Sequence, residues 1–414
     1  MNTSRLSCVF GFAFAIAYFS TTSIAVDQGE FRISKLPSGG AYSSAAFAPN
    51  GGHLAAIAQT VSRGEQGIEI AEEIQLWDFR QPKLLSKKIL SRKKSLLDAP
   101  YHGISLFGYA ASGSMILLGR DDRLVLLDSA TFAKIREISL ATGNWPGVSP
   151  NSGSSFVKEV TVARSADRAT VLLQWGPGGG GELRVYHLSS GELIRSWDYY
   201  SLRKTRDRSA EFGGADISAD GRQVAVSVIP FVLGEGILRS AERNVFVLDV
   251  DSGATISAIN TGYPAGEVRF PSTSTPLLLT VSADNFDRQR SPKDAIKVWD
   301  PVSGKLLREF DSPQQGTHFQ VQASSDGQTV LGYTGAEKFR GRWRLGQEEY
   351  GFAEYDQFTL WDLTTGKIKA SSPKMPASDI PRNFLLSPDG DVVLLNSETA
   401  GGKTLMFYTL PQSH

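Results

Sequence analysis

One segment, residues 333–357, combines side chains that are typical of protein-binding surfaces. Its aromatic and arginine residues include Phe339, Trp343, Tyr350, Phe352 and Tyr355, with Arg340, Arg342 and Arg344. Aromatic rings and guanidinium groups dominate many binding interfaces because both give a large contact area at a low entropic cost. The chemistry indicated is recognition of a partner rather than catalysis. The alternative is that these rings fold back to cover the body of the protein, because large apolar patches rarely stay exposed.

Two basic runs lie elsewhere in the chain. The first comprises Lys87, Lys88, Arg92, Lys93 and Lys94, and the second comprises Arg203, Lys204, Arg206 and Arg208. Clustered positive charge attracts anionic polymers, so an envelope polysaccharide or a lipid head group is a candidate ligand. A solvated charged surface is the alternative interpretation. The chain as a whole balances 43 Lys and Arg against 43 Asp and Glu, which argues against a nucleic-acid-binding protein.

Residues that would identify an enzyme or a cofactor site are scarce. The five histidines do not recur at metal-binding spacings, and no His-Glu-x-x-His or Gly-x-Ser-x-Gly motif occurs. His102 and His318, which we place near the starts of inner strands, are the histidines that would meet across a central channel. Glycine-rich runs at 176–181 and 400–404 mimic phosphate-binding loops, but we expect no helix after either of them. The sequence therefore assigns no catalytic residue, no cofactor and no metal.

Composition indicates the class of fold. The chain has 414 residues, of which 41% are hydrophobic and 21% are charged, as in an ordinary globular protein. Its 41 glycines are about 10% of the chain, above the usual ~7%. This excess indicates many turns and therefore a β-rich architecture.

Residues 1–25 have the layout of a secretory signal peptide. Arg5 supplies the positive charge, residues 6–19 are largely apolar, and small residues lead to a cleavage point after Ala25. The apolar stretch is shorter than the ~20 residues needed to span a bilayer, so we expect no transmembrane segment after cleavage. The only cysteine, Cys8, would be removed, which excludes disulfides and thiolate chemistry from the mature chain. We therefore expect a periplasmic or secreted protein of a bacterial envelope.

Two short patterns recur along the rest of the chain. The first is a tight turn rich in Ser, Asp, Asn and Gly that precedes an apolar strand, at 48–51, 111–113, 165–167, 218–221, 324–327 and 387–390. The second is an apolar strand that commonly ends in Asp, at 74–78, 124–128, 183–187, 245–249, 296–300, 358–362 and 405–409. Several copies of the second pattern continue through a Ser/Thr-Gly turn into another strand. Each repeat therefore supplies four strands, a to d, joined by tight a–b and c–d turns.

Four-stranded units repeated around a ring are the blades of a β-propeller. The repeat resembles that of the WD40 family, whose strand c ends in Trp-Asp and leads into a Thr-Gly-Lys turn. The residues that carry the resemblance are Trp77, Asp78, Asp128, Asp249, Trp299, Asp300, Trp361 and Asp362. The resemblance covers the whole mature chain and is strongest in the copies at 299–300 and 361–362. A looser bacterial propeller of the quinoprotein-like or YVTN type is the alternative.

The seven copies of strand c predict an all-β fold, one seven-bladed β-propeller of four-stranded antiparallel blades over residues 26–414. The last copy ends close to the end of the sequence, so the last blade lacks its fourth strand. An unassigned strand at 31–36 is available to fill that place. We expect this N-terminal strand to close the ring, because closure leaves no open β-edge between the first and last blades.

The repeats average about 55 residues, against ~40–45 for a plain WD40 unit, so they contain insertions. We assign these insertions to b–c loops at 60–73, 229–244, 283–295 and 333–357, and to d–a loops at 91–101, 141–158, 198–213 and 371–383. Because the strands alternate in direction, all of these loops emerge on one face of the ring, the b–c/d–a face. Long loops on a rigid scaffold commonly carry binding function.

We therefore predict an exported, non-enzymatic scaffold that binds a protein or an envelope glycan through the b–c/d–a face. Its candidate contact residues are the aromatic and arginine residues of 333–357 named above, together with Arg203, Arg206 and Arg208. The alternative is a propeller enzyme, of the lactonase or polysaccharide-acting type, with its site at the channel mouth. Clustered carboxylates or histidines with perturbed pKa values at that mouth would favour the enzyme.

Overall fold

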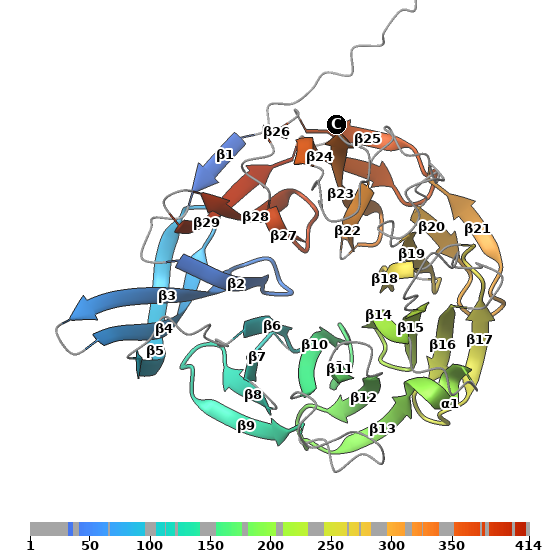
Figure 1. Cartoon of the computed structure of the whole chain (residues 1–414), viewed down its shortest axis with the longest axis horizontal. Helices are drawn as coiled ribbons and strands as arrows, with labels where there is room; N and C mark the ends of the chain where they lie inside the picture. Colours follow the sequence, from blue (N-terminus) through green and yellow to red (C-terminus); the bar gives the residue numbers. More distant parts are fainter. Residues whose placement is uncertain are drawn as a thin grey trace, which may run out of the picture.

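The computed structural model shows β-strands arranged in a ring around a central axis (Figure 1). The residues that the structure describes are 32–35, 41–64, 67–95, 105–111, 113–120, 123–140, 155–175, 181–203, 210–230, 244–262, 265–272, 275–282, 296–310, 317–324, 326–338, 352–372, 375–376, 381–399 and 402–410. Within these ranges the strands form seven antiparallel sheets, each of which is one blade. No helix within the same ranges is long and apolar enough to cross a membrane.

In blades 1 to 6 the strands follow one another in chain order from the central axis outward, as strands a to d (Figure 1). Blade 1 consists of β2 (Ala41–Phe47), β3 (Leu54–Gly64), β4 (Gly67–Asp78) and β5 (Lys83–Ser95). Blade 2 consists of β6 (Ser105–Tyr109), β7 (Met115–Arg120), β8 (Arg123–Asp128) and β9 (Lys134–Ser139). Blade 3 consists of β10 (Ser155–Val162), β11 (Arg168–Trp175), β12 (Gly181–His187) and β13 (Leu193–Asp198), and the short helix α1 (Tyr199–Arg203) follows it.

The remaining blades repeat this order. Blade 4 consists of β14 (Ala210–Ile217), β15 (Gln223–Pro230), β16 (Val245–Asp249) and β17 (Thr255–Ile259). Blade 5 consists of β18 (Ala265–Arg269), β19 (Leu278–Ser282), β20 (Ile296–Trp299) and β21 (Leu306–Glu309). Blade 6 consists of β22 (Thr317–Ala323), β23 (Thr329–Lys338), β24 (Phe352–Asp362) and β25 (Ile368–Ser371), with β26 (Met375–Pro376) paired to β24. Blade 7 consists of β27 (Pro381–Leu386), β28 (Val392–Thr399), β29 (Gly402–Thr409) and β1 (Arg32–Lys35).

The N-terminal strand closes the ring, as the sequence predicted. β1 pairs antiparallel with β29, from Arg32 opposite Thr409 to Lys35 opposite Met406, and thereby becomes strand d of blade 7 (Figure 1). A second link joins the first and last blades on the side of the tight turns, where Arg80 forms ion pairs with Asp389 and Asp391. The predicted all-β ring of four-stranded blades is confirmed.

The hydrophobic core lies between blades rather than in one central mass. Each of seven clusters of buried side chains joins two neighbouring blades. Trp361 of blade 6, for example, is fully buried and packs in one cluster with Val298 and Phe310 of blade 5. Because every blade is covered on both faces, the ring forms a rigid frame for its inner strands and loops.

The strand-c aspartates hold the c–d turns. Asp362 accepts hydrogen bonds from the backbone N–H of Thr365 at 2.7 Å and from its hydroxyl at 3.0 Å. Asp78, Asp128, Asp249 and Asp300 likewise accept backbone N–H groups two or three residues ahead of them. Side chains of this kind compensate for backbone donors that a tight turn leaves unpaired.

The c–d turns are also tied to the neighbouring blade. Residues near the start of an outer strand donate to a carbonyl in the c–d turn region of the next blade. The contacts are Arg136 to Ser190 O at 2.9 Å, Ser257 to Pro301 O at 2.5 Å and Arg308 to Leu363 O at 2.5 Å. Arg195 donates to Asp251 O in the same way. These polar links supplement the apolar clusters and fix the turn side of the ring.

Replacing Gly366 by alanine is expected to destabilise the protein by about 1–2 kcal/mol, because its φ of +71° is unfavourable for a residue with a Cβ. An added Cβ would also lie 2.9 Å from the Phe310 ring of the adjacent blade. Gly262→Ala is the matched control, since its φ is +81° but the nearest atom would be 3.7 Å away. Urea denaturation of both variants measures the difference; equal losses would exclude the contribution of packing against Phe310.

Candidate functional site

A cavity of about 680 Å³ lies at the centre of the ring, toward the a–b turns. All seven inner strands contribute to its wall, and so do a–b turn residues such as Pro49, Ser165 and Pro388. Its volume falls within the range of about 300–1,000 Å³ that is usual for small-molecule sites. This cavity therefore lies at the end of the channel opposite the b–c/d–a face.

The inner strands present an unequal set of side chains to this cavity. The inner strands can be compared at one equivalent position in every blade. It is the inner-strand residue whose strand-b partner pairs with the third residue of the five-residue strand-c motif. Its occupants, in blade order, are Ala46, Gly108, Thr161, Asp216, Arg269, Gln322 and Leu385. The wall is therefore polar along blades 3 to 6 and apolar or uncharged along blades 7, 1 and 2.

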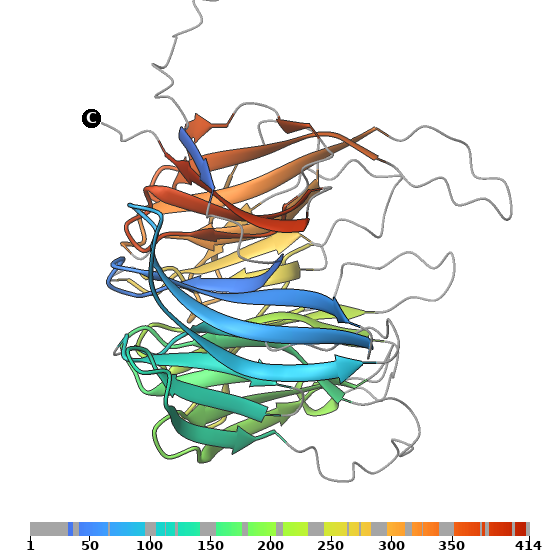
Figure 2. The same cartoon turned by 90° about the vertical axis from the view of Figure 1, so that its left-hand side faces the viewer.

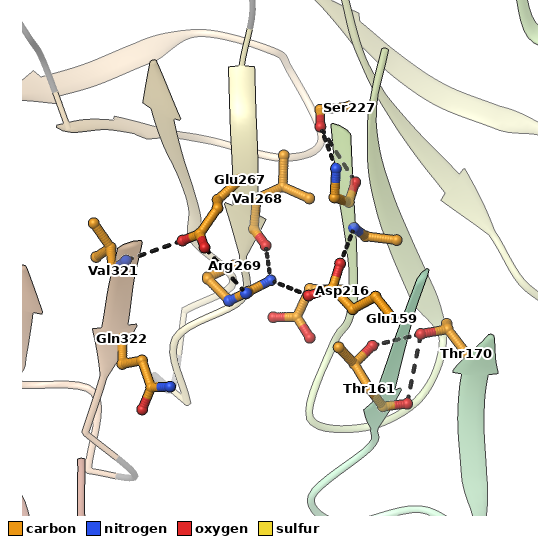
Figure 3. Close-up of polar contacts among 12 residues, drawn as sticks. Glu159, Thr161, Thr170, Asp216, Ser227, Glu267, Val268, Arg269, Val321 and Gln322 are labelled. Carbon is orange, nitrogen blue, oxygen red and sulfur yellow. Dashed lines mark hydrogen bonds and ion pairs between the residues drawn. The ribbon is translucent and has the colours of Figure 1, made fainter. Parts of the chain in front are cut away.

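Arg269 is the centre of a charged cluster on the polar wall (Figure 3). Its guanidinium lies between two carboxylates, 2.9 Å from Glu159 on β10 and 3.7 Å from Glu267 on its own strand. It also donates to the carbonyl of Val268 at 3.0 Å. Burial lowers the pKa of Arg269, but the carboxylates of Glu159, Glu267 and Asp216 outweigh burial and raise it. Arg269 is therefore permanently charged, and carboxylates lie on two sides of it.

The carboxylates of the cluster also connect neighbouring blades. Glu159 accepts the N–H of Ala215 from blade 4 at 2.9 Å, and Glu267 accepts the N–H of Val321 from blade 6 at 2.9 Å. Asp216 accepts the N–H of Phe270 from blade 5 at 2.6 Å.

Gln322 shows that these bridges do not need a charge. At the register position of Asp216, its amide oxygen accepts the N–H of Leu386 from blade 7 at 2.8 Å. A neutral side chain is therefore able to connect two blades at this position. The bridge that Asp216 forms between blades 4 and 5 therefore does not require a negative charge at this position.

Asp216, which lines the cavity, has a carboxyl group with a raised pKa. Burial raises its pKa to about 6, because removal from water outweighs the attraction of Arg269 and the hydrogen bond from Phe270. Burial raises the pKa of Glu267 as well. Within the described part of the chain Asp216 forms no ion pair. A carboxylate with these properties is able to exchange a proton near neutral pH or to bind a cation.

The b–c/d–a face is extended along blades 6, 7 and 1, which are consecutive in the ring. In blade 1 the inner strand stops pairing at Gln59, whereas the β3–β4 hairpin continues to Gly64 opposite Gly67. The β23–β24 hairpin likewise continues to Lys338 opposite Phe352, beyond the end of β22. In Figure 2 the far ends of β3 and β23–β24 point to the same side, opposite the tight turns.

The two extended hairpins, called here the β3–β4 arm and the β23–β24 arm, show that two of the predicted b–c loops are wrong. Residues 60–64 and 67–73 form the two strands of a hairpin, and both ends of 333–357 are strand as well. The physical reason is that the two strands continue to pair as far as Gly64 opposite Gly67. Val61 on this arm is 59% exposed, which is high for an apolar residue in a strand.

The predicted contact residues lie mostly outside the described ranges. This applies to Phe339, Arg340, Arg342, Trp343, Arg344, Tyr350, Arg206 and Arg208. Phe352 and Tyr355 are placed by their backbone in β24, opposite Lys338 and Ala336, and Arg203 ends helix α1. The described β23–β24 arm therefore leads directly into the aromatic and arginine segment at 339–351.

The first basic run is a strand, not a loop. Lys87, Lys88 and Arg92 lie in β5, the outer strand of blade 1. Lys87 pairs with Glu73 at 3.2 Å and Arg92 with Glu69 at 3.0 Å, both on the adjacent strand β4. Lys88 donates to the carbonyl of Phe132 in blade 2 at 2.9 Å. The two carboxylates neutralise the charges of Lys87 and Arg92, which reduces the attraction for an anionic polymer.

Histidines do not form a metal site in the described part of the chain. No group of three or more His, Cys, Asp or Glu residues there is arranged to hold a metal ion. His102 lies outside the described ranges, and His318 is placed only by its backbone in β22. His187 stands at the end of β12, with its Nδ1 at 3.3 Å from the carbonyl of Asp167.

Comparison with known proteins establishes the fold. No protein-family model and no curated protein matches the sequence. A solved β-propeller domain of Myceliophteria thermophila Cps50 (Swd1) superposes with a TM-score of 0.58 at 12% identity, covering 92% of this chain and all of that one. A chain of the Mitotic Checkpoint Complex superposes with a TM-score of 0.54 at 13% identity, with full coverage of both chains. The chain has a WD40-like β-propeller fold. At these identities the likeness concerns the fold alone.

The charged cluster of this propeller was not identified from the sequence. Its members stand in inner strands where polar and apolar residues alternate, as in Glu159-Val160-Thr161 and Glu267-Val268-Arg269. Aligning the inner strands by their strand-c partners would have shown that blades 3 to 6 carry polar residues at one position. Every inner strand contains a β-bulge that shifts its pairing with strand b. The position of each bulge is needed for the alignment and cannot be recognised in the sequence.

Proposed function

We propose that this chain is an exported, non-enzymatic binding propeller that holds a protein or an envelope glycan on its b–c/d–a face. The observation that carries the proposal is the extension of the b–c hairpins in three consecutive blades, 6, 7 and 1. A β-arm fixed to a rigid ring presents the segment at its end at a low entropic cost of binding. The segment at the end of the β23–β24 arm, 339–351, is the one richest in aromatic and arginine residues.

The proposed sequence of events begins with removal of residues 1–25 on export to the periplasm or beyond the cell. The mature ring then presents Trp343, Arg342 and their neighbours as the central anchors of an interface. Anchors of these types commonly dominate the binding energy, while surrounding contacts exclude water. Arg203, Arg206 and Arg208 after blade 3 would add electrostatic steering rather than affinity.

Replacing residues 339–351 by a short Gly/Ser linker is expected to abolish partner binding without unfolding the ring. The described strands end at Lys338 and resume at Phe352, so the replacement leaves the β23–β24 pairing intact. A partner is first captured from the native envelope and secreted fraction, identified, purified and then titrated against both proteins. Trp343→Ala alone is expected to weaken the complex by about thirtyfold, as for a hot-spot residue worth about 2 kcal/mol.

The control variant replaces residues 65–66, at the tip of the β3–β4 arm, by the same kind of linker. An unchanged urea midpoint of unfolding shows that each variant keeps its ring. A folded 339–351 variant that retains full affinity for the partner contradicts the proposal. Equal losses of affinity in both variants would show that the partner contacts the whole extended face and not only the β23–β24 arm.

An enzymatic alternative has one specific observation in its favour, the raised pKa of Asp216 in the central cavity. General acid–base catalysis is most effective when the pKa of the catalytic group lies near the working pH. Hydrolysis of a lactone or of an envelope polysaccharide by the native chain, and its loss in Asp216→Asn, would favour this alternative. The hydrogen bond from Phe270 and the proximity of Arg269 are also compatible with a carboxylate that binds a ligand without taking part in catalysis.

A further inference from the structure

The central cavity combines a charged wall with an apolar wall, and this combination restricts what it can hold. On the side of blades 3 to 6 the lining includes Glu159, Thr161, Asp216, Arg269 and Gln322. On the side of blades 7, 1 and 2 it includes Leu385, Leu386, Ala46, Phe47, Phe107 and Tyr109. A ligand that satisfies both walls has a polar end and an apolar body.

The charge of the polar wall selects a cation. The carboxylates of Glu159, Asp216 and Glu267 stand against the single guanidinium of Arg269, so the cluster has a formal charge of −2 when all four groups are ionised. Arg164, which lines the cavity and donates to Ser272 at 2.8 Å, reduces the formal charge of this group to −1, with Glu267 standing behind the lining residues. An entering cation would therefore complete the charge balance, whereas an anion would increase the imbalance.

Asp216 has unused capacity to accept hydrogen bonds. Its two oxygens accept one backbone N–H each, from Ile217 at 2.9 Å and from Phe270 at 2.6 Å. A carboxylate accommodates about four hydrogen bonds. The side chain is only partly buried and lines the cavity, so the remaining lone pairs are accessible from it.

A second, independent observation comes from Tyr109 on the opposite wall. Tyr109 lines the cavity, is only 6% exposed, and its hydroxyl has no hydrogen-bond partner among the described residues. A buried hydroxyl without a partner costs free energy, so such groups commonly indicate a missing ligand or water. Tyr109 and Asp216 both line this cavity.

We propose that the central cavity binds a small organic cation, an ammonium or guanidinium group carried on an aromatic or aliphatic body. The cationic group lies against Asp216 and Glu159, and the body packs against Phe47, Phe107 and the leucines of blade 7. The ligand enters from the a–b turn face, where Pro49, Ser165 and Pro388 line the cavity. This site is on the opposite side of the ring from the proposed partner surface and does not depend on it.

The test compares three probes that share one aromatic body: 2-phenylethylammonium, 2-phenylethanol and phenylacetate. Their affinities for the full chain are measured by calorimetric titration or ligand-observed NMR at pH 7.5. The ammonium is expected to bind at least about tenfold more tightly than the alcohol, because a hydrogen bond to a charged group contributes about 1.5–3 kcal/mol. Phenylacetate is expected to bind most weakly. Equal affinities for the ammonium and the alcohol would overturn the proposal.

The decisive variant is Asp216→Asn, which removes the charge and keeps an oxygen to accept the Phe270 N–H, while the N–H of Ile217 loses its acceptor. It is expected to weaken ammonium binding by about ten- to hundredfold while leaving the alcohol unchanged. Glu159→Gln serves as a second variant and is expected to weaken the ammonium selectively too. Asp251→Asn is the matched control, since its carboxylate is exposed beside Arg168 outside the cavity.

The results separate this site from the proposed function. The chain with residues 339–351 replaced is expected to bind the ammonium as tightly as the native chain does. Unchanged ammonium affinity in both Asp216→Asn and Glu159→Gln would refute the cavity site and leave the partner-binding proposal untouched. Loss of ammonium binding in Asp251→Asn would refute it as well, because only the net charge would then matter.

Discussion

Removal of residues 31–36 is expected to lower the free energy of unfolding by about 2–4 kcal/mol, from the loss of a few backbone hydrogen bonds at about 1 kcal/mol each. The segment contributes β1, which pairs with β29 over four residue pairs. Without it, the outer edge of β29 is open, and the edge strand becomes a template for pairing with another chain. We therefore expect a lower urea midpoint together with concentration-dependent association in size-exclusion chromatography.

A synthetic peptide of residues 29–38 distinguishes strand pairing from other effects of the truncation. Added to the truncated protein, it is expected to raise the urea midpoint toward that of the native chain. The same peptide with Ile33 and Lys35 replaced by proline is the control, because proline cannot donate to a β-ladder. Rescue by both peptides, or an unchanged midpoint after truncation, would show that β1 contributes nothing to closure. Arg80, which pairs with Asp389 and Asp391, would then be the main polar link between the first and last blades.

The sequence predicted the ring because its signals are local. A turn such as Ser387-Pro388-Asp389-Gly390 is stabilised by contacts within a few residues: Ser387 donates to Asp389 at 2.6 Å and accepts the N–H of Val392 at 2.9 Å. The strand-c aspartates act over two or three residues in the same way. Repetition of these local units at regular spacing is sufficient to determine four strands per blade and the number of blades.

The cavity is not predictable in this way because its contacts are distant in the chain. Glu159 meets Ala215 and Arg269, which are 56 and 110 residues away. Each of these residues alone is an ordinary polar residue of a β-strand, and only the curvature of the ring brings them together. The arms of blades 1 and 6 were missed for a different reason. Length alone does not distinguish a long loop from two strands that continue to pair, as at Lys338 opposite Phe352.

The charge of Asp216 is expected to make the native chain less stable, relative to Asp216→Asn, as the pH rises from 4 to 7. Burial raises the pKa of Asp216 to about 6 in the folded protein, whereas an unfolded chain has an aspartate pKa of about 3.9. Between these two values the folded state binds more protons than the unfolded state, so stability falls with rising pH. A difference of about two pKa units corresponds to about 3 kcal/mol, which is the upper limit for the relative loss at pH 7.

The measurement is the difference in unfolding free energy between the two proteins, from urea denaturation at half-unit intervals of pH. Four charged groups interact with Asp216 and are present in both proteins: Glu159 on β10, Arg164, and Glu267 and Arg269 on β18. Asp362→Asn is the control, for which the expected change of stability with pH has the opposite sign. Burial alone would raise the pKa of Asp362, but its hydrogen bonds from Thr365 lower it, so the native chain should lose stability relative to that variant as the pH falls. A pH-independent difference for Asp216→Asn would show that this carboxylate is as well solvated in the ring as in the unfolded chain, and it would remove the main energetic reason for a cation to bind beside it.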